Sequence, residues 1–202
     1  MAIFGVMLAG GGGVRLGGVD KAQLKLGNTN LATLVYNQIF PQSDFLSITF
    51  APDSERSSLP ENVARLTDKF DPQIGPLGGI YAGFEWAKSL GATDQNDYLL
   101  IVPIDSPLFP SDFVQQAVPL MQISDVVVAR YGDQEYPTCS LWRCGAASRI
   151  GATRSGARNN SVRGYLDKLE VGYIDFLSSH PEDPFKNVNK ISDLIKLSAR
   201  TT

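Results

Sequence analysis

Four nearly continuous apolar runs, separated by segments of helical periodicity, constrain the fold of this chain more than any other feature. The runs are Ile3–Leu8, Phe45–Phe50, Tyr98–Pro103 and Asp125–Arg130. Runs of this length without polar alternation are typical of strands that are covered on both faces. The sequence therefore predicts buried strands within an α/β fold.

The segments around these runs predict helices and further strands. Residues 31–39 and Phe113–Met121 each place apolar side chains on one helical face, and Pro119 is expected to kink or end the second helix. We also expect extended segments at Tyr136–Trp142 and Val171–Phe176, and helices near Ser161–Leu169 and Ile191–Ala199. Strands that alternate with helices indicate βαβ units in a mixed sheet.

Composition excludes several classes of protein. The chain has 202 residues without a repeat or a low-complexity linker, so residues 1–202 are expected to form a single domain. Lys and Arg number 18 against 21 Asp and Glu, a net charge of -3 that argues against a protein held on nucleic acid by bulk charge. No apolar run approaches the roughly 18 residues of a membrane span. The apolar segment 1–9 lacks a basic start, so we expect no export signal.

The cysteine and histidine content argues against a zinc site and a disulfide framework. Cys139 and Cys144 lie five residues apart without CxxC spacing, and His180 is the single histidine of the chain. Cys139 is expected to face the core.

A glycine-rich loop comes directly after the first predicted strand, with six glycines in residues 10–18. Glycine lets backbone N–H groups approach a ligand closely and Lys21 adds a positive charge, so the loop indicates a phosphate-binding site. The P-loop pattern fails because Lys21 precedes Ala22, and the dinucleotide fingerprint fails because Arg15 and Leu16 occupy the place of its last glycine. A merely flexible linker is the alternative.

Asp105 stands just beyond the buried run Tyr98–Pro103. Open α/β sheets bind ligands at the carboxyl ends of their strands, and Mg²⁺ needs only one or two carboxylates beside phosphate oxygens and water. Asp105 is therefore a candidate magnesium ligand. The alternative is an Asp that caps the turn before Pro107.

The segment Gly75–Gly83 predicts a helix that begins at Pro76. Gly78 and Gly79 each cost about 1 kcal/mol relative to Ala inside a helix. We therefore expect a neighbour that packs closely against them.

Taken in chain order, these segments resemble the MobA family of nucleotidyltransferases, the molybdenum cofactor guanylyltransferases. Residues 8–21, LAGGGGVRLGGVDK, match the family signature LAGGxSxRMGxxK, with Gly13 at its small-residue position. GPLGG at 75–79 resembles GPLAG, DSPLFP at 105–110 resembles DxPxxP, and FKNVN at 185–189 with Asp193 and Leu194 resembles F-x-N-V-N-x-x-x-[DE]-L. Tyr136-Pro137-Thr138 matches HPT with Tyr in place of His, so no proton-transfer role is carried over to Tyr136.

The resemblance spans about Gly5–Leu194 and implies both a fold and an activity. The fold is a Rossmann-like three-layer α/β/α sandwich with a mostly parallel mixed sheet, of the nucleotide-diphospho-sugar transferase type. The activity is transfer of GMP from GTP to molybdopterin with release of pyrophosphate, with Mg²⁺ as cofactor. Contacts with other proteins that make or accept the molybdenum cofactor are also implied. A cytoplasmic location is expected from the missing export signal and the use of GTP.

The same resemblance assigns roles to individual residues. Arg15, Lys21 and Asp105 would act in catalysis, with Asp105 binding the metal. Nucleotide contacts would come from Leu8, Ala9, Gly10, Gly11, Lys21, Asp68, Gly78 and Asp105. The second substrate would meet Arg158, Arg163, Asn187 and Asn189 in and near a basic stretch that starts at Arg154. A surface turn for Asp68, a solvated basic loop for the arginines and a helix cap for Asn189 are the structural alternatives.

Two other functions fit the same motifs. One is a sister nucleotidyltransferase that uses CTP on molybdopterin or a nucleoside triphosphate on a sugar phosphate. The other is a nucleotide-binding module that has lost catalysis, for which Tyr136 is the mild argument and intact Lys21 and Asp105 are the counterargument.

Overall fold

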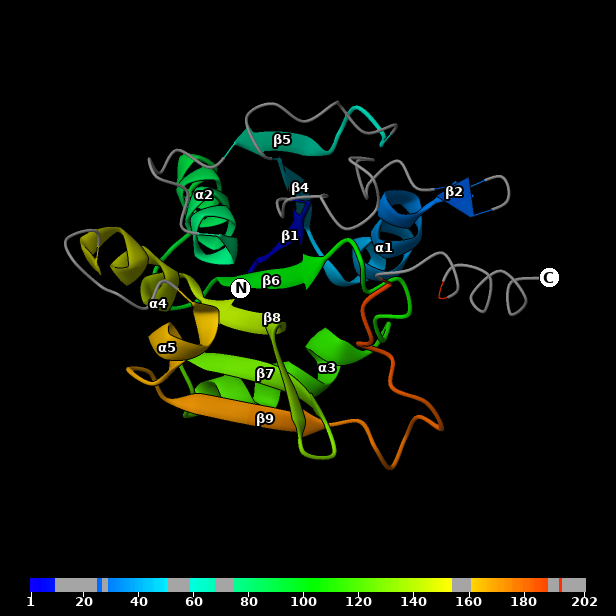
Figure 1. Cartoon of the computed structure of the whole chain (residues 1–202). Helices are drawn as coiled ribbons and strands as arrows, with labels where there is room; N and C mark the ends of the chain where they lie inside the picture. Colours follow the sequence, from blue (N-terminus) through cyan, green and yellow to red (C-terminus); the bar gives the residue numbers. More distant parts are fainter. Residues whose placement is uncertain are drawn as a thin grey trace.

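Seven strands form one sheet in the computed structural model, which describes residues 1–9, 25–26, 29–50, 59–67, 75–153, 161–188 and 193 (Figure 1). The strands are β1 (Ile3–Leu8), β4 (Phe45–Phe50), β5 (Ala64–Thr67), β6 (Tyr98–Pro103), β7 (Val126–Tyr131), β8 (Gln134–Arg143) and β9 (Val171–Asp175). Their order is β5-β4-β1-β6-β8-β7-β9. Neighbours are parallel except where β8 pairs antiparallel with β6 and β7. The predicted strands and the mostly parallel mixed sheet are confirmed.

The predicted helices that fall on described residues are present, with one correction, and the structure adds short helices at residues 40–42 and 144–153 that were not predicted. The helices are α1 (Leu31–Ile39), η3 (Phe40–Gln42), α2 (Pro76–Ser89), α3 (Phe113–Ala117), η4 (Val118–Gln122), α4 (Cys144–Ser148), η5 (Arg149–Thr153) and α5 (Val162–Leu166), and a small separate pair of strands comprises β2 (Lys25–Leu26) and β3 (Thr29–Asn30). As expected, α3 ends just before Pro119 and continues as the 3-10 helix η4. No helix within the described ranges is long and apolar enough to cross a membrane.

The correction concerns the helix expected near Ser161–Leu169, which ends at Leu166. Ser161 caps its start by accepting a hydrogen bond from the Gly164 N–H. Beyond Leu166 the chain closes short turns instead, with Lys168 N donating to Tyr165 O and Leu169 N donating to Leu166 O. The helix expected at Ile191–Ala199 lies outside the described residues, apart from position 193.

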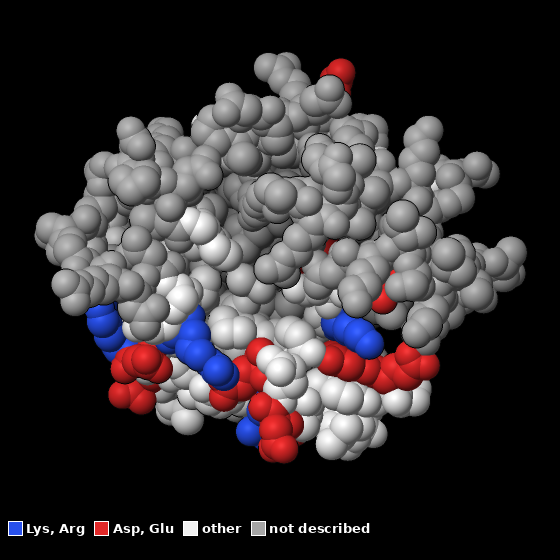
Figure 2. All heavy atoms as spheres, viewed as in Figure 1, with Lys and Arg blue, Asp and Glu red and all other residues white. Residues whose placement is uncertain are grey.

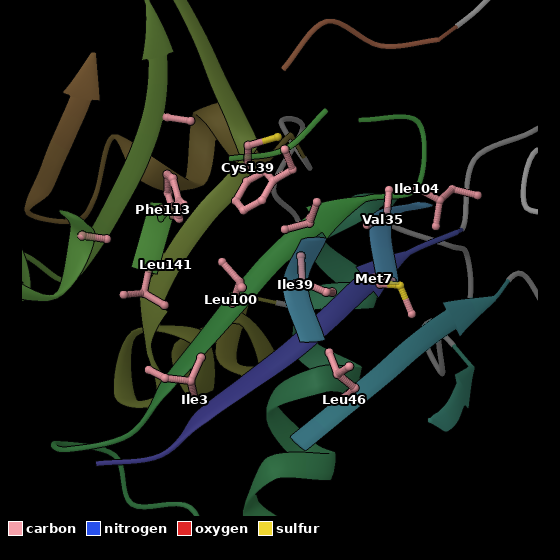
Figure 3. Close-up of a cluster of buried hydrophobic side chains, with 14 of the residues drawn as sticks. Ile3, Met7, Val35, Ile39, Leu46, Leu100, Ile104, Phe113, Cys139 and Leu141 are labelled. Atoms are coloured by element: carbon pink, nitrogen blue, oxygen red, sulfur yellow. The ribbon is translucent and has the colours of Figure 1, made fainter. Parts of the chain in front are cut away.

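Side chains of alternating direction along the strands build one core on each face of the sheet. One core contains Ile3, Met7 and Leu100 together with residues of α1 and α3, and Figure 3 shows Val35 of α1 and Phe113 of α3 facing these strands. The other core contains Phe4 and Val6 together with residues of α2, α4 and α5. The three-layer α/β/α arrangement predicted for the chain is thus confirmed.

A glycine on α2 allows this helix to lie directly on β1. A Cβ atom at Gly83 would sit 2.6 Å from Val6 Cγ2 and 3.1 Å from Val6 Cγ1, closer than packed atoms tolerate. Because Val6 is fully buried and branched at Cβ, its side chain has little freedom to turn away. Gly83 therefore sets the distance between helix and sheet.

We predict that Gly83→Ala lowers the free energy of unfolding by about 1–3 kcal/mol because of this overlap. Helix propensity alone predicts the opposite sign, a gain of about 1 kcal/mol. Urea denaturation followed by circular dichroism distinguishes the two, with exposed Glu85→Ala on the same helix as control. A more stable Gly83→Ala protein would contradict the close packing of α2 on β1.

Candidate active site

The carboxyl ends of β1 and β6 lie side by side, and the strand order reverses between them. Leu8 is paired with Pro103, and the Ile104 N–H donates to Leu8 O at 3.1 Å. From β1 the chain passes through α1 to β4 on one side, and after α2 it returns to β6 on the other. Connections that leave in opposite directions open a crevice at this place in doubly wound sheets. Ala9, which donates to Thr49 O at 2.9 Å, and Asp105 both belong to this edge.

The first turn of α2 reaches the same edge. Gly75 adopts φ 65°, a value that favours glycine, and Pro76 opens the helix as predicted. A Cβ atom at Gly79 would lie 2.8 Å from Leu8 Cδ2 and 3.0 Å from Thr49 Oγ1, so the expected close packing is confirmed at Gly79. Gly78 is buried in the same turn. The positive end of the α2 dipole therefore lies near the ends of β1 and β4, where it favours an anion.

Asp105 lies in the turn after β6, and the chain near Asn187 is bound to that turn. Val188 N donates to Asp105 O at 2.8 Å. Buried Ser106 donates through its hydroxyl to Phe185 O at 3.4 Å and to Asn187 Oδ1 at 3.3 Å. Asp105 is half-buried and Asn187 is exposed. The fold thus brings together two residues that the sequence analysis assigned to different substrates.

This donor set fits a magnesium ion. Among the described residues no three His, Cys, Asp or Glu side chains cluster in a way that would hold a metal ion. At the described edge, the carboxylate of Asp105 is available as a hard oxygen ligand. Mg²⁺ is commonly held by one or two carboxylates, with phosphate oxygens and water completing its coordination.

A bulge in β8 shapes the other side of the edge. Val128 pairs with Ser140 whereas the next residue of β7, Ala129, pairs with Tyr136, so residues 137–139 have no partner in the ladder. Pro137, which has no N–H to donate, stands in this bulge. Cys139 is buried as predicted, and its thiol lies 3.8 Å from the Ser106 hydroxyl. Burial raises the pKa of this thiol well above its ordinary value, so Cys139 stays protonated.

Tyr136 makes a polar contact at the border of the bulge. Its hydroxyl donates a short hydrogen bond to Asp183 Oδ2. Burial raises the pKa of Tyr136 above its ordinary value, and the bond to Asp183 and the charge of that carboxylate raise it further. Tyr136 is therefore a protonated donor at neutral pH.

Phe185 anchors the segment that carries Asn187. Its ring is fully buried, with ring centroids 5.3 Å from Tyr136, 6.0 Å from Phe109 and 5.1 Å from Phe176. Aromatic side chains contribute large buried areas and favourable tilted contacts. The position of Asn187 and Val188 thus depends on an aromatic cluster formed by four parts of the chain.

Arg163 lies on α5 and is held by an acidic neighbour. Its guanidinium forms an ion pair with Glu135 at the start of β8. The hydrogen bond and the charge of Glu135 raise the pKa of Arg163. A second pair joins Arg130 to Asp175 at 3.3 Å. Charges of both signs alternate over β9 and the β7–β8 hairpin in the lower part of Figure 2, so this surface is not a purely basic patch.

The remaining predicted site residues lie outside the described residues. They are Gly10, Gly11, Arg15, Lys21, Asp68, Arg154, Arg158 and Asn189. Sequence reasoning in turn missed Ser106, Asp183 and Glu135. Pro137 within an otherwise extended segment was a usable signal for the bulge, whereas no local pattern pairs Asp183 with Tyr136, which is 47 positions away.

The reversal of strand order, the start of α2 and the carboxylate after β6 define a doubly wound α/β protein with a candidate ligand site at the carboxyl edge of the sheet. Comparison with known proteins identifies the family within this class. Residues 5–170 match the model of the MobA-like NTP transferase domain. The chain belongs to this family, so the resemblance found in the sequence is confirmed.

Individual relatives agree with that assignment. The chain is 35% identical over 199 residues to a molybdenum cofactor guanylyltransferase of Cereibacter sphaeroides, covering 97% of this chain and 95% of the relative. Molybdopterin-guanine dinucleotide biosynthesis protein A of Archaeoglobus fulgidus shares the fold, with TM-score 0.71, 20% identity and 98% of each chain covered. A Mycobacterium tuberculosis protein solved as a complex with manganese also shares it, with TM-score 0.65, 13% identity and 98% of each chain covered.

We predict that Phe185→Ala lowers the free energy of unfolding by about 3–5 kcal/mol, because truncating a buried aromatic ring leaves a cavity. Urea denaturation measures the loss. The adjacent exposed side chain provides the control, since Lys186→Ala is expected to change stability by less than about 0.5 kcal/mol. Equal effects from both substitutions would show that the aromatic cluster does not anchor this segment.

Proposed function

We propose that this protein transfers GMP from GTP to the terminal phosphate of molybdopterin, releasing pyrophosphate and forming the molybdopterin guanine dinucleotide cofactor. The observation that carries the proposal is the convergence of three elements on one edge: the end of β1, the first turn of α2 and the Asp105 turn. The near full-length similarity to a curated guanylyltransferase supports the choice of substrates. We extend the proposal to a single catalytic domain that covers residues 1–202.

The chemistry requires positioning and charge neutralisation more than acid–base catalysis. The acceptor phosphate is already anionic near neutral pH, so one of its oxygens can attack the α-phosphate of GTP without a general base. The new P–O bond forms as the bond between the α- and β-phosphates breaks, and pyrophosphate leaves with the electron pair. Oriented donors that match developing charge lower such barriers most. The single histidine, His180, packs on Phe176 and is not needed in this scheme.

The described residues supply the fixed parts of the nucleotide side. The backbone would approach the nucleotide at Leu8, Ala9 and Gly78. The positive end of the α2 dipole would stabilise the phosphates of the nucleotide. Asp105 would hold Mg²⁺, which when bound neutralises triphosphate charge and polarises the α-phosphate. The manganese complex of the related Mycobacterium tuberculosis protein supports a divalent cation in this fold.

Sequence motifs supply the other proposed contacts. Gly10 and Gly11 would donate backbone N–H groups to phosphate oxygens, Lys21 and Arg15 would stabilise the departing pyrophosphate, and Asp68 would accept from the base or ribose. Arg158, Arg163, Asn187 and Asn189 would bind the phosphate or pterin of the second substrate. For Arg163 this requires exchanging Glu135 for the ligand. The use of GTP supports a cytoplasmic location, and contacts with proteins that make or accept the cofactor complete the proposal.

The glycine loop and Asp105 do not by themselves select the base of the nucleotide. A transferase that uses CTP, or one that acts on a sugar phosphate, would share the glycine loop and Asp105. An inactive nucleotide-binding module would share the pocket but not turnover.

Thermal unfolding with each of the four nucleoside triphosphates plus Mg²⁺ tests the substrate directly. We expect GTP at 100 times its dissociation constant to stabilise the protein by about 2.7 kcal/mol, raising Tm by roughly 5–10 °C. ATP, CTP and UTP are the matched controls. A shift selective for CTP or UTP would reassign the protein to a sister transferase, and no shift with any of them would count against a nucleotide site.

Asp105→Ala tests the metal assignment. We expect turnover to be abolished while unfolding changes little, because the hydrogen bond from Val188 uses the backbone oxygen of Asp105, which the substitution retains. Steady-state release of pyrophosphate and urea denaturation measure the two effects. Lys21→Ala is expected to be similarly impaired in turnover. Normal activity of Asp105→Ala would remove Asp105 from the metal site.

A further inference from the structure

Two tyrosine hydroxyls hold the chain that returns from β9 to the Asp105 turn. Tyr131 on β7 donates to His180 O at 3.2 Å, and Tyr136 on β8 donates to Asp183 Oδ2. The two contacts lie on neighbouring strands and bind the same connecting segment, residues 176–188. They differ in how directly they reach Phe185. Tyr136 contacts Phe185 with its own ring and is one residue removed through Asp183, whereas from Tyr131 the contacts pass through His180 and Phe176 before they reach Phe185.

Asp183 connects the Tyr136 hydroxyl to the backbone N–H of Phe185. While its Oδ2 accepts from Tyr136, its Oδ1 accepts from Phe185 N at 3.0 Å, the pattern of an Asx-turn. The Phe185 ring packs back on the Tyr136 ring, with centroids 5.3 Å apart. Tyr136 thus fixes Phe185 twice, once through Asp183 and once by ring contact.

The next contacts reach the metal candidate. Phe185 O and Asn187 Oδ1 both accept from the Ser106 hydroxyl, and Val188 N donates to Asp105 O. Tyr136 is thus joined to the Asp105 turn by hydrogen bonds and a packed ring, and the last step to Asp105 runs along the backbone from Ser106 or through the hydrogen bond from Val188. A hydroxyl that donates to an ionised carboxylate in a half-buried place is among the stronger contacts available to this segment.

We propose that Tyr136 and Asp183 form a positioning pair that holds residues 183–188 against the Asp105 turn and so fixes the placement of Asp105 relative to Asn187. This proposal rests on the proposed function, in which Asp105 and Asn187 both face the reacting phosphates. In this proposal Tyr136 and Asp183 act through Phe185 and Ser106 and not by contact with substrate. The proposal also gives a role to the residue that departs from the family's HPT pattern, since the tyrosine hydroxyl extends from the aromatic ring to the Asp183 carboxylate.

The test uses Tyr136→Phe, Asp183→Ala and the double variant in the full chain. Tyr136→Phe removes only the hydroxyl and leaves the ring on Phe185. We expect it to lower kcat about ten-fold or more, because small misplacements of reacting groups are costly, while KM for GTP changes less than two-fold. Affinity for Mn²⁺ in the presence of GTP, measured by electron paramagnetic resonance, should fall by a similar factor. The double variant should match Asp183→Ala, since both substitutions break the same contact.

Tyr131→Phe is the matched control. Like Tyr136→Phe, it removes one hydroxyl that binds residues 176–188. If the two hydroxyls only stabilised this segment, both substitutions would have equal effects. We expect kcat and Mn²⁺ affinity of Tyr131→Phe to stay within two-fold of the unmodified protein. Equal losses in both variants, or a Tyr136→Phe protein with unchanged kcat and Mn²⁺ affinity, would overturn the proposal.

Amide hydrogen exchange separates failure of the pair from failure of the proposed function. In the protein without any substrate, Tyr136→Phe should speed exchange at Phe185 and Val188, whose N–H groups depend on the pair, and Tyr131→Phe should not. Unchanged exchange at both amides would overturn the positioning pair whatever the enzyme does. Faster exchange in Tyr136→Phe, together with an unmodified protein that neither binds Mn²⁺ with GTP nor turns over, would retain the contact and reject the proposed function, and with it the placement for catalysis.

Discussion

The pairing of β1 with β6 is the constraint on which the rest of the site depends. It brings together the carboxyl ends of two strands. In the sequence, β1 is followed by the glycine-rich loop and β6 by Asp105, and the chain continues from the two strands to strands on opposite sides of this pair. The pairing is fixed by burial on both faces, since Val6, Met7 and Ile101 are fully inaccessible to water and a shift of one residue would exchange the two cores. The burial of β1 and β6 therefore determines where the proposed site lies, at the carboxyl ends of these two strands.

Much of this arrangement could be predicted from the sequence, for reasons that are local. Continuous apolar runs located β1, β4 and β6 to the residue, and Pro119 and Pro76 marked the end of one helix and the start of another. Asp105 was a candidate because a carboxylate directly after a buried strand must emerge at the ligand-binding edge. In each case the signal lies within a few residues of the feature that it predicts.

The parts that escaped prediction depend on partners distant in the chain. Asp183 contacts Tyr136 and Ser106 contacts Asn187 only because the connection after β9 returns to the sheet edge, and no spacing rule encodes that return. Helix α5 was overestimated because the apolar pattern continues to Leu169 although the backbone changes to short turns after Leu166. The ion pair of Arg163 with Glu135 likewise shows that a basic side chain on the correct edge can already have a partner, which a count of arginines does not reveal.

The bulge at residues 137–139 divides β8 into two halves with different neighbours. Residues 140–142 pair with both β6 and β7, whereas residues 134–136 pair with β7 and not with β6. The outer half of β8 consequently forms an arm with β7, joined by a turn in which Gly132 adopts φ 58°, and β9 pairs with Ala129 and Arg130 on the other side of β7. Lengthening or shortening this arm would leave the register of β6 untouched. The placement of the Asp105 turn after β6 therefore does not depend on the length of this arm.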